Sequence, residues 1–343
     1  MVVWYDVAMT QKEVKTPVTE FENWLTILEL GRYAPTPHNT QWYFLHPIND
    51  KTAKVGIDSS IQLPFTDPAD QFRFTGLGVF VRHLELAAQA VGFNLETEFN
   101  VSDKQYPVTV RIVAKRPRDS KLPNILTNRQ TSRLAYKKEA ISDEAIIALE
   151  KLTDGKNSAH ISTSESVVTS ILNLNNQVLL NDLQDKGVGN ELDNWIRYSK
   201  QAQVEHPSGF TPDTLATSAW KLWLVFKFRK VMLIGPFKKW LTSQYFKQNM
   251  TATVGWLYGP LATRQNQYDA GRYMMDVWIK VTELGYYMQP YGSIITNNEA
   301  RSSFLADIKQ DEENGNMVWL AFRIGSSAKP AQSPRKSKQE YIR

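Results

Sequence analysis

The run "GRYAPTPHNTQWYFLHP", residues 31–47, places many polar side chains beside an aromatic run. Its hydrogen-bonding side chains are Thr36, Asn39, Thr40 and Gln41. The backbone around them is restricted by Pro35 and Pro37. Donors and acceptors held in this way suit the polar edge of a heteroaromatic ring. They suit a rigid, hydrogen-bonded turn between a helix and a strand equally well, and the residues alone leave both interpretations open.

A second run, "NRQTSR" at residues 128–133, carries two arginines four residues apart. Arg129 and Arg133 share a side whether the segment is helical or extended, and Thr131 joins them if it is extended. Two guanidinium groups with hydroxyls between them suit a phosphate monoester dianion. The alternative is a solvated basic turn.

Two further runs lie near the end of the sequence. In "GYYMQPYGS", residues 285–293, a helix is predicted to end and a loop with Gly and Pro to present backbone N–H groups beside aromatic rings. Such N–H groups can stabilise a developing negative charge. An ordinary connection between a helix and a strand is the alternative interpretation of the same residues. In "FRIGSSAKPAQSPR", Arg335 is a candidate for a further phosphate ligand if the segment folds back, and disorder is the alternative.

Hydrophobic periodicity predicts the elements that position these runs. In the first part we expect helices at 18–31 and 69–91, strands at 42–48, 54–58, 94–100 and 108–114, and a loop at 116–128. In the second part we expect helices at 142–152, with Ser142 as N-cap, 165–183, 188–202, 268–284 and 299–309, and strands at 159–164 and 316–325.

Composition limits the function classes. The 343 residues are 42% hydrophobic and 22% charged, which is ordinary for a soluble globular protein of one large or two smaller domains. Cysteine is absent, so disulfides, thiolate nucleophiles and cysteine metal sites are excluded. The five histidines show no metal-ligand spacing. The first residues lack the pattern of a secretory signal, and we expect a cytoplasmic protein.

The net charge of +5 is unevenly distributed along the chain, because no acidic residue occurs between Thr214 and Tyr268. Within that block, "AWKLWLVFKFRKVMLIGPFKKWL" at residues 219–241 is strongly apolar but interrupted by cations. Central cations and the Gly235–Pro236 pair exclude a membrane-spanning helix. Three interpretations are left: a lid over a ligand, an interfacial helix on an anionic membrane, or a nucleic-acid patch. We favour the lid, with membrane contact second.

Taken in order, the four runs resemble the motifs of the nitroreductase superfamily of FMN-dependent oxidoreductases. Within it, the chain is most similar to the Acg-like branch, where two nitroreductase-type halves share one chain. The resemblance covers about residues 20–335. The sequence departs from the family pattern at Thr36, where serine is usual, and in lacking a proline before Trp42.

The resemblance implies an α+β, nitroreductase-like fold, an internally duplicated single-chain pseudo-dimer with a helical lid insertion. The first half would span 18–118 and the second 119–330, with the lid at about 205–262 and a tail at 331–343. The first half has the proline-rich loop but lacks the arginine motif, and the second half has the reverse. One FMN per chain, between the halves, is therefore expected.

The resemblance also assigns cofactor contacts. The flavin edge and ribityl chain would contact Pro35, Thr36, Pro37 and Asn39. The phosphate would contact Arg129, Thr131, Arg133 and Arg335. The ring would lie against Gln289, Pro290, Tyr291 and Gly292. No side chain is expected to act as acid, base, nucleophile or metal ligand, since FMN carries the chemistry.

The expected function is hydride transfer from NADH or NADPH, through FMN, to a small nitroaromatic, quinone or similar acceptor. A catalytically quiet FMN-storage protein with a lid over the cofactor is the alternative. A third interpretation is a peripheral membrane or scaffold protein with a vestigial flavin site. The expected partners are a small-molecule acceptor and no nucleic acid. Peripheral membrane contact through 219–241 is a secondary expectation, and the chain would be a monomeric pseudo-dimer or a homodimer.

Overall fold

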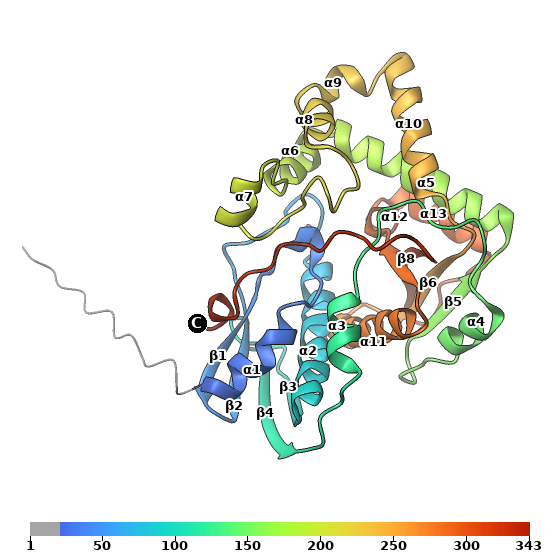
Figure 1. Cartoon of the computed structure of the whole chain (residues 1–343). Helices are drawn as coiled ribbons and strands as arrows, with labels where there is room; N and C mark the ends of the chain where they lie inside the picture. Colours follow the sequence, from blue (N-terminus) through green and yellow to red (C-terminus); the bar gives the residue numbers. More distant parts are fainter. Residues whose placement is uncertain (1–20) are drawn as a thin grey trace, which may run out of the picture.

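A computed structural model describes residues 21–343, which form two four-stranded sheets (Figure 1). The first sheet contains β1 (Tyr43–Asn49), β2 (Thr52–Ile57), β4 (Val108–Lys115) and β3 (Phe93–Phe99), in that order. The second contains β5 (Ser158–Ser162), β6 (Val254–Pro260), β8 (Asn316–Gly325) and β7 (Tyr287–Pro290). Every neighbouring pair is antiparallel. The two sheets therefore share strand order and sense.

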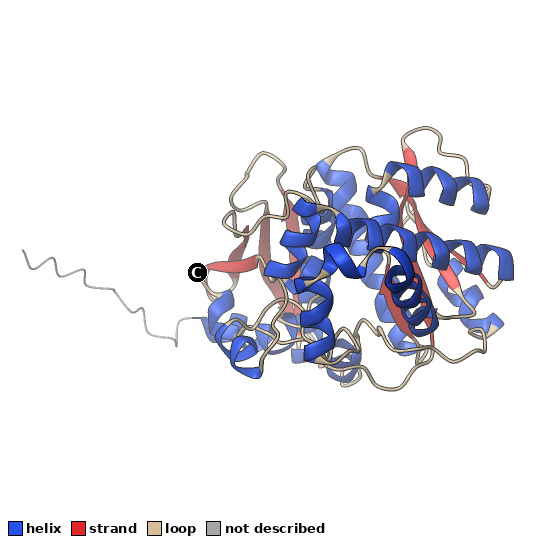
Figure 2. Cartoon of the chain, turned by 90° about the horizontal axis from the view of Figure 1, so that it is seen from above, coloured by secondary structure: helices blue, strands red, loops and turns tan. Residues whose placement is uncertain are grey.

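Two long helices, α2 (Gln71–Val91) and α11 (Arg264–Glu283), lie between the sheets (Figures 1 and 2). They cross at Gly78 and Gly271. A Cβ on Gly78 would lie 2.0 Å from the carbonyl oxygen of Tyr268, and one on Gly271 would lie 1.8 Å from that of Thr75. Only glycine allows backbones to approach this closely. Because α11 supplies side chains to the cores of both sheets, the halves form one packed body.

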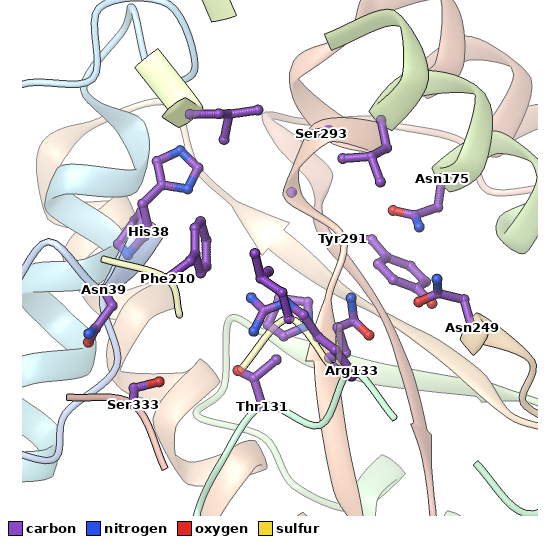
Figure 3. Close-up of a pocket in the computed structure, with 18 of the residues that line it drawn as sticks. His38, Asn39, Thr131, Arg133, Asn175, Phe210, Asn249, Tyr291, Ser293 and Ser333 are labelled. Carbon is purple, nitrogen blue, oxygen red and sulfur yellow. The ribbon is translucent and has the colours of Figure 1, made fainter. Parts of the chain in front are cut away.

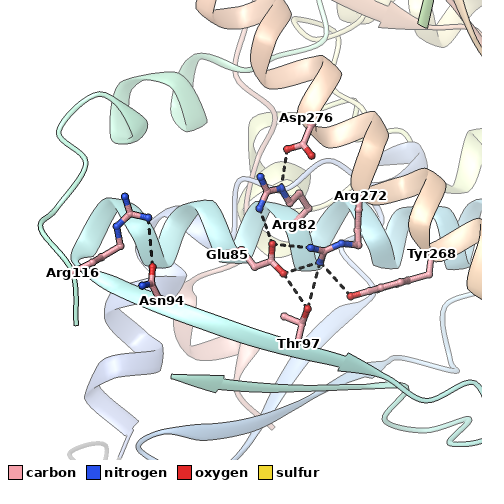
Figure 4. A network of polar contacts seen from close by, with 8 residues as sticks. All are labelled: Arg82, Glu85, Asn94, Thr97, Arg116, Tyr268, Arg272 and Asp276. Atoms are coloured by element: carbon pink, nitrogen blue, oxygen red, sulfur yellow. Dashed lines mark hydrogen bonds and ion pairs between the residues drawn. The ribbon is translucent and has the colours of Figure 1, made fainter. Parts of the chain in front are cut away.

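An ion network joins the same two helices (Figure 4). Arg82 on α2 donates to Asp276 on α11 at 2.8 Å, and Arg272 on α11 donates to Glu85 on α2 at 2.7 Å. Arg82 also donates to Glu85 at 2.8 Å. The contact between the halves thus combines close backbone packing with paired, part-buried charges.

Shorter helices complete the halves. The first sheet is preceded by α1 (Glu22–Gly31) and the second by α4 (Asp143–Glu150), and α3 (Leu122–Asn128) lies between the halves in sequence. Ser142 caps α4 by accepting a hydrogen bond from the backbone N–H of Ala145, as predicted. The second sheet is covered on its other face by α5 (Glu165–Gln184), α12 (Gly292–Thr296) and α13 (Asn298–Ile308).

A long helical insertion connects β5 to β6. It contains α5, α6 (Lys186–Asn194), α7 (Lys200–Glu205), α8 (Ala219–Lys227), α9 (Arg229–Met232) and α10 (Gly235–Asn249). Figure 1 shows α8, α9 and the upper part of α10 standing above the sheets. The expected lid at 205–262 overlaps this insertion but also includes β6, which is an inner strand of the second sheet. The insertion therefore ends before Val254.

The chain after β8 crosses back to the first half. The backbone N–H of Arg343 donates to the carbonyl oxygen of Leu45 at 2.9 Å, and Ile342 forms a parallel bridge with Leu45. The short 3-10 helix η3 (Lys338–Tyr341) places Tyr341 in the first core, where it is 3% exposed. The tail is thus anchored at both ends, by β8 and by β1.

Most predicted elements are confirmed within one to four residues; the part of the first helix at 18–20 lies outside the described residues. Two predicted loops are wrong. The loop at 116–128 contains α3, since Pro123 stands in the first helical turn, where proline is tolerated. The loop at 285–293 contains β7, because pairing with β8 outweighs its Gly and Pro content.

The predicted helix at 188–202 is also wrong, because it is interrupted. After α6 ends, the backbone of Trp195 and Arg197 pairs with Phe210, with N–H to O distances of 2.7 and 2.8 Å. This non-local pairing uses backbone N–H and C=O groups that a continuous helix would need for its own hydrogen bonds. It also fixes the turn around residues 206–210 beside the first half.

Candidate functional site

A cavity of about 1860 Å³ lies between the two halves, the insertion and the tail (Figure 3). All twelve predicted site residues line it: Pro35, Thr36, Pro37, Asn39, Arg129, Thr131, Arg133, Gln289, Pro290, Tyr291, Gly292 and Arg335. They come from four parts of the chain that are far apart in sequence. The fold therefore brings the four motif runs to one place.

The loop between α1 and β1 has an unusual backbone. His38, Asn39 and Gln41 all have positive φ, at 50°, 55° and 53°. Residues with a Cβ adopt this region rarely and at an energetic cost, so surrounding contacts must hold it. One such contact is internal, from the backbone N–H of Gln41 to the Thr36 hydroxyl oxygen at 3.0 Å.

The insertion and the tail supply the other contacts to this loop. The Asn39 amide nitrogen donates to the carbonyl oxygens of Pro334 at 3.0 Å and Gly209 at 3.2 Å. The Gln41 amide nitrogen donates to the carbonyl oxygen of Pro207 at 2.7 Å. Both amides are buried. The amide side chains that suggested ligand recognition therefore join three chain segments, and Asn39 acts on the cavity through its neighbours.

Arg129 and Arg335 form a pair of cations on the cavity wall, with Arg129 buried and Arg335 half-buried. Both donate to the carbonyl oxygen of Tyr33, at 3.0 and 3.3 Å, and Arg335 also donates to Asn39 Oδ1. Among the described residues neither has a carboxylate partner. Arg129 Nε and Nη1 and Arg335 Nε are buried with no hydrogen-bond partner. These groups are equipped to bind an anion.

The electrostatics of the pair point the same way. Burial, and then the charge of Arg335, lower the pKa of Arg129 to about 9. Burial also lowers the pKa of Arg335. Two like charges in a poorly solvated place are unfavourable until a negative charge joins them. A bound dianion would reverse both effects.

Arg133 contacts other groups than this pair does. Its Nη1 donates to the carbonyl oxygen of Thr214 at 3.3 Å, and its guanidinium lies 5.0 Å from the centre of the Phe210 ring (Figure 3). Thr131, between the two arginines of the motif, forms a parallel bridge with Met288 on β7. Contact of all four expected residues with one phosphate stays a prediction.

Arg323 on β8 organises the surrounding wall. It is fully buried, and its guanidinium donates to Gln289 Oε1 at 2.9 Å and to the carbonyl oxygens of Leu134 at 2.9 Å and Gln248 at 3.2 Å. It thus ties β7, the arginine motif and the end of α10 together. Sequence reasoning missed this residue, although a lone cation in the apolar run "MVWLAFRIG" was a readable signal.

His38 is a neutral imidazole on the cavity wall. Its Nε2 lies 3.2 Å from the Thr66 hydroxyl, which donates to Glu191 on α6. Because that hydroxyl gives its proton to the carboxylate, it accepts from Nε2–H and leaves His38 Nδ1 as an acceptor. Burial, and then Arg133, lower the pKa of His38 to about 4. Thr66 and Glu191 are distant in sequence and carried no signal.

The second half supplies a partly aromatic wall. Tyr291 is 2% exposed, its backbone N–H donates to the carbonyl oxygen of Ala321 at 2.7 Å, and burial raises the pKa of its hydroxyl. That hydroxyl, Asn175 Nδ2 and Asn249 Oδ1 are buried without partners. Figure 3 shows these three side chains on the same side of the cavity. Here too the wall offers polar atoms that no protein group satisfies.

The insertion gives the cavity an apolar upper part. The lining side chains there include Leu179, Leu183, Leu222, Val225, Phe226 and Met232. The insertion also lines the cavity with polar side chains, among them Asp182, Lys221 and Gln244. Within residues 21–343, no helix is long and apolar enough to cross a membrane. In the same range, His, Asp and Glu side chains do not cluster in groups that could hold a metal ion.

Comparisons with known proteins give distant structural likenesses only. No family model and no curated protein matches the sequence. The chain is similar to the FMN-dependent nitroreductase NfnB from Mycobacterium smegmatis in complex with NADPH (11% identity, 64% of this chain, 96% of that chain, TM-score 0.40). It is similar to a nitroreductase with bound FMN from Bacteroides fragilis (12%, 62%, 91%, 0.35) and to a BluB-like flavoprotein from Clostridium difficile (13%, 64%, 95%, 0.36). At these values, function has to be argued from the site itself.

Proposed function

We propose that the cavity binds one FMN and that the protein is an oxidoreductase of the nitroreductase type. The observation that carries the proposal is the Arg129–Arg335 pair, which has unused buried N–H donors and no carboxylate partner in the described chain. A phosphate monoester fits this donor set. The motif runs and the distant structural likenesses agree with it.

The residues present fit the rest of the cofactor. Tyr291, Gln289 and Pro290 provide a partly aromatic wall for a flat ring, and Pro35, Thr36 and Pro37 provide a rigid opposite edge. Ligand pockets usually enclose about 300–1,000 Å³. A cavity of about 1860 Å³ leaves room for a second molecule beside the cofactor. When bound, FMN would supply the acceptance and donation of hydride.

Each part of the chain then has a role. Arg129 and Arg335 hold the phosphate, and Asn39 orients Arg335. Arg133, which contacts Phe210 and Thr214, provides a positive charge near the ring, which favours the negative charge gained on reduction. His38 offers a hydrogen-bond acceptor at Nδ1. The reductant would be NADH or NADPH, and the acceptor a small nitroaromatic, quinone or similar molecule that occupies the remaining space.

A catalytically quiet FMN-storage protein is the second candidate. It is favoured by α8 and α10, which line the upper cavity and cover it. We further propose that the shared strand order of the two sheets reflects an internal duplication, as in the Acg-like branch. The single complementary pairing of the proline-rich loop with the arginine motif then gives one site per chain.

The first test is the visible spectrum of the purified protein. We expect a yellow protein that releases about one FMN per chain on denaturation, the number following from the single arginine pair. A colourless protein that gains no flavin absorbance with added FMN would falsify the cofactor assignment. Two flavins per chain would contradict the one-site model alone.

A further inference from the structure

The outer side of α8, α9 and α10 exposes an unusual number of large apolar side chains. We call residues 219–240 the arch. Its exposed members are Trp220, Trp223, Phe228, Val231, Ile234, Phe237 and Trp240, between 46% and 64% exposed. They are seven of the fourteen large apolar side chains that are exposed in residues 21–343. Such a concentration on one surface indicates a binding role.

The same surface is positively charged. Its lysines are Lys221, Lys227, Lys230, Lys238 and Lys239, and none forms an ion pair within residues 21–343. No carboxylate occurs between Thr214 and Tyr268 that could neutralise them. The cations therefore add to one another over the arch.

These exposed side chains are not needed for the interior. The inner side of the arch is already packed, with Leu222, Phe226 and Leu233 buried at 0–8% exposure. The favoured interpretation, a lid over a ligand, accounts for this inner side only, because the outer side contacts solvent.

We propose that the arch docks on an anionic lipid bilayer. Aromatic and aliphatic side chains enter the interface to about 5–10 Å, while lysines contact anionic headgroups. A second copy of the chain would bring two lysine-rich surfaces together, which is repulsive. A nucleic acid would neutralise the lysines but leave Val231, Ile234 and Phe237 in water. Only a bilayer satisfies both properties of the surface.

Two side chains of the arch also line the cavity. Trp220 and Trp240 line the cavity and are 64% and 53% exposed. They therefore belong to both the arch and the cavity wall. Docking would bring this part of the wall against the lipid, so that an apolar molecule dissolved in the bilayer could enter between these side chains without crossing water. Docking itself requires no bound cofactor, so it is tested separately from the proposed function.

The test is co-sedimentation of the full chain with phosphatidylcholine vesicles, with and without phosphatidylglycerol. We expect binding to the anionic vesicles only, weakened by high salt. The variant K227Q/K230Q/K239Q should bind about 100-fold more weakly, because each lysine near an anionic leaflet contributes roughly fivefold. The variant V231S/I234S/F237S should also lose binding. None of these six side chains lines the cavity.

The matched control is I48S/V101S/V113S, which removes three other exposed apolar side chains from the first half. It should bind like the wild type. Far-UV circular dichroism checks that all variants are folded. Equal binding to neutral and anionic vesicles, or no binding to either, overturns the proposal. A lipid-free dimer that V231S/I234S/F237S dissociates, measured by analytical ultracentrifugation, would assign the arch to a second copy instead.

Discussion

At the scale of single residues, the site depends on charges that the protein itself leaves incompletely paired. Arg129 and Arg335 share one carbonyl oxygen, while the fully buried Arg323 has protein acceptors for its whole guanidinium. The first two are therefore suited to binding a ligand and the third to holding the wall. This difference in role can be measured by replacing each arginine and comparing ligand affinities.

Replacing Arg335 or Arg129 with alanine should weaken FMN binding by about ten- to a hundredfold, since a hydrogen bond to a charged group contributes about 1.5–3 kcal/mol. Riboflavin, which has no phosphate, should bind nearly as before. Fluorescence titration of both ligands gives the two ratios. Arg323→Ala is the control, because it should lower thermal stability and weaken both ligands alike. Equal losses for both ligands in Arg335→Ala would contradict the phosphate assignment.

His83 provides a pH-dependent test of the same region. Burial, and then Arg129, lower its pKa to about 3, and its Nε2 lies 3.0 Å from the carbonyl oxygen of Leu30. The unfolded chain, with a histidine pKa of about 6.5, binds a proton that the folded chain rejects. The free energy of unfolding should therefore fall as pH drops below about 6.5.

In urea unfolding of the cofactor-free protein, the wild type should lose about 2 kcal/mol more than His83→Gln between pH 7 and pH 5. Glutamine keeps an N–H donor for Leu30 but does not titrate. The exposed His206→Asn serves as control and should follow the wild type. Parallel stability curves for wild type and His83→Gln would show that His83 is not held neutral.

Residue types could be read from the sequence more easily than residue roles. Arginines, hydroxyls and prolines in the motif runs predicted that distant segments would meet, and the twelve residues line one cavity. The role of Asn39 could not be read, because its partners lie about 170 and 295 residues further along the chain. The same holds for Glu191, which reaches His38 only through Thr66. Long-range hydrogen bonds leave no local pattern.

At the scale of elements, local signals located the two central helices and the long strand β8, where apolar periodicity is sustained. They failed where non-local pairing decides the structure. β7 forms because β8 lies beside it, and α6 ends just before Trp195 and Arg197, which pair with Phe210. The partner of the outer side of the arch could not be predicted either, because exposed apolar side chains can pack against a protein, a ligand or a lipid.

The insertion allows the enzyme and the storage protein to be distinguished. Replacing residues 219–246 with a Gly/Ser linker removes α8, α9 and most of α10. It keeps Gln248, which donates to the carbonyl oxygen of Arg133, and β6. If the insertion restricts access, flavin reduction by NADPH should become faster by on the order of tenfold. Anaerobic stopped-flow absorbance measures this rate.

The control for this deletion is Trp223→Ser, which changes an exposed side chain that does not line the cavity. Its reduction rate should equal that of the wild type. If NADPH and NADH reduce the flavin of the wild type too slowly for turnover, and reduce that of the deletion variant quickly, the FMN-storage protein is favoured. Unchanged rates in a folded, flavin-loaded deletion would exclude a restricting lid.

At the scale of the whole molecule, the glycine crossing makes the two halves interdependent. Alanine usually stabilises a helix relative to glycine by roughly 0.5–1 kcal/mol. Gly78→Ala should instead destabilise by about 3 kcal/mol, since its Cβ would lie 2.0 Å from the carbonyl oxygen of Tyr268 and the helices would have to move apart. Thermal unfolding followed by circular dichroism measures the change. A neutral or stabilising effect would mean that the helices are not in contact there.

The tail after β8 should affect the rate at which a ligand leaves the cavity more than the affinity of the ligand. Residues 329–333 line the cavity, Arg335 belongs to the arginine pair, and the segment is fastened beyond them at Leu45. Release of a molecule held by Arg335 should therefore be coupled to detachment of that end of the chain. Exchange of such a ligand should be slow. Its rate should depend on how often the last residues detach from Leu45 more than on the strength of any single contact to the ligand. The dissociation half-life would then depend on the contact at Leu45, a residue that does not line the cavity.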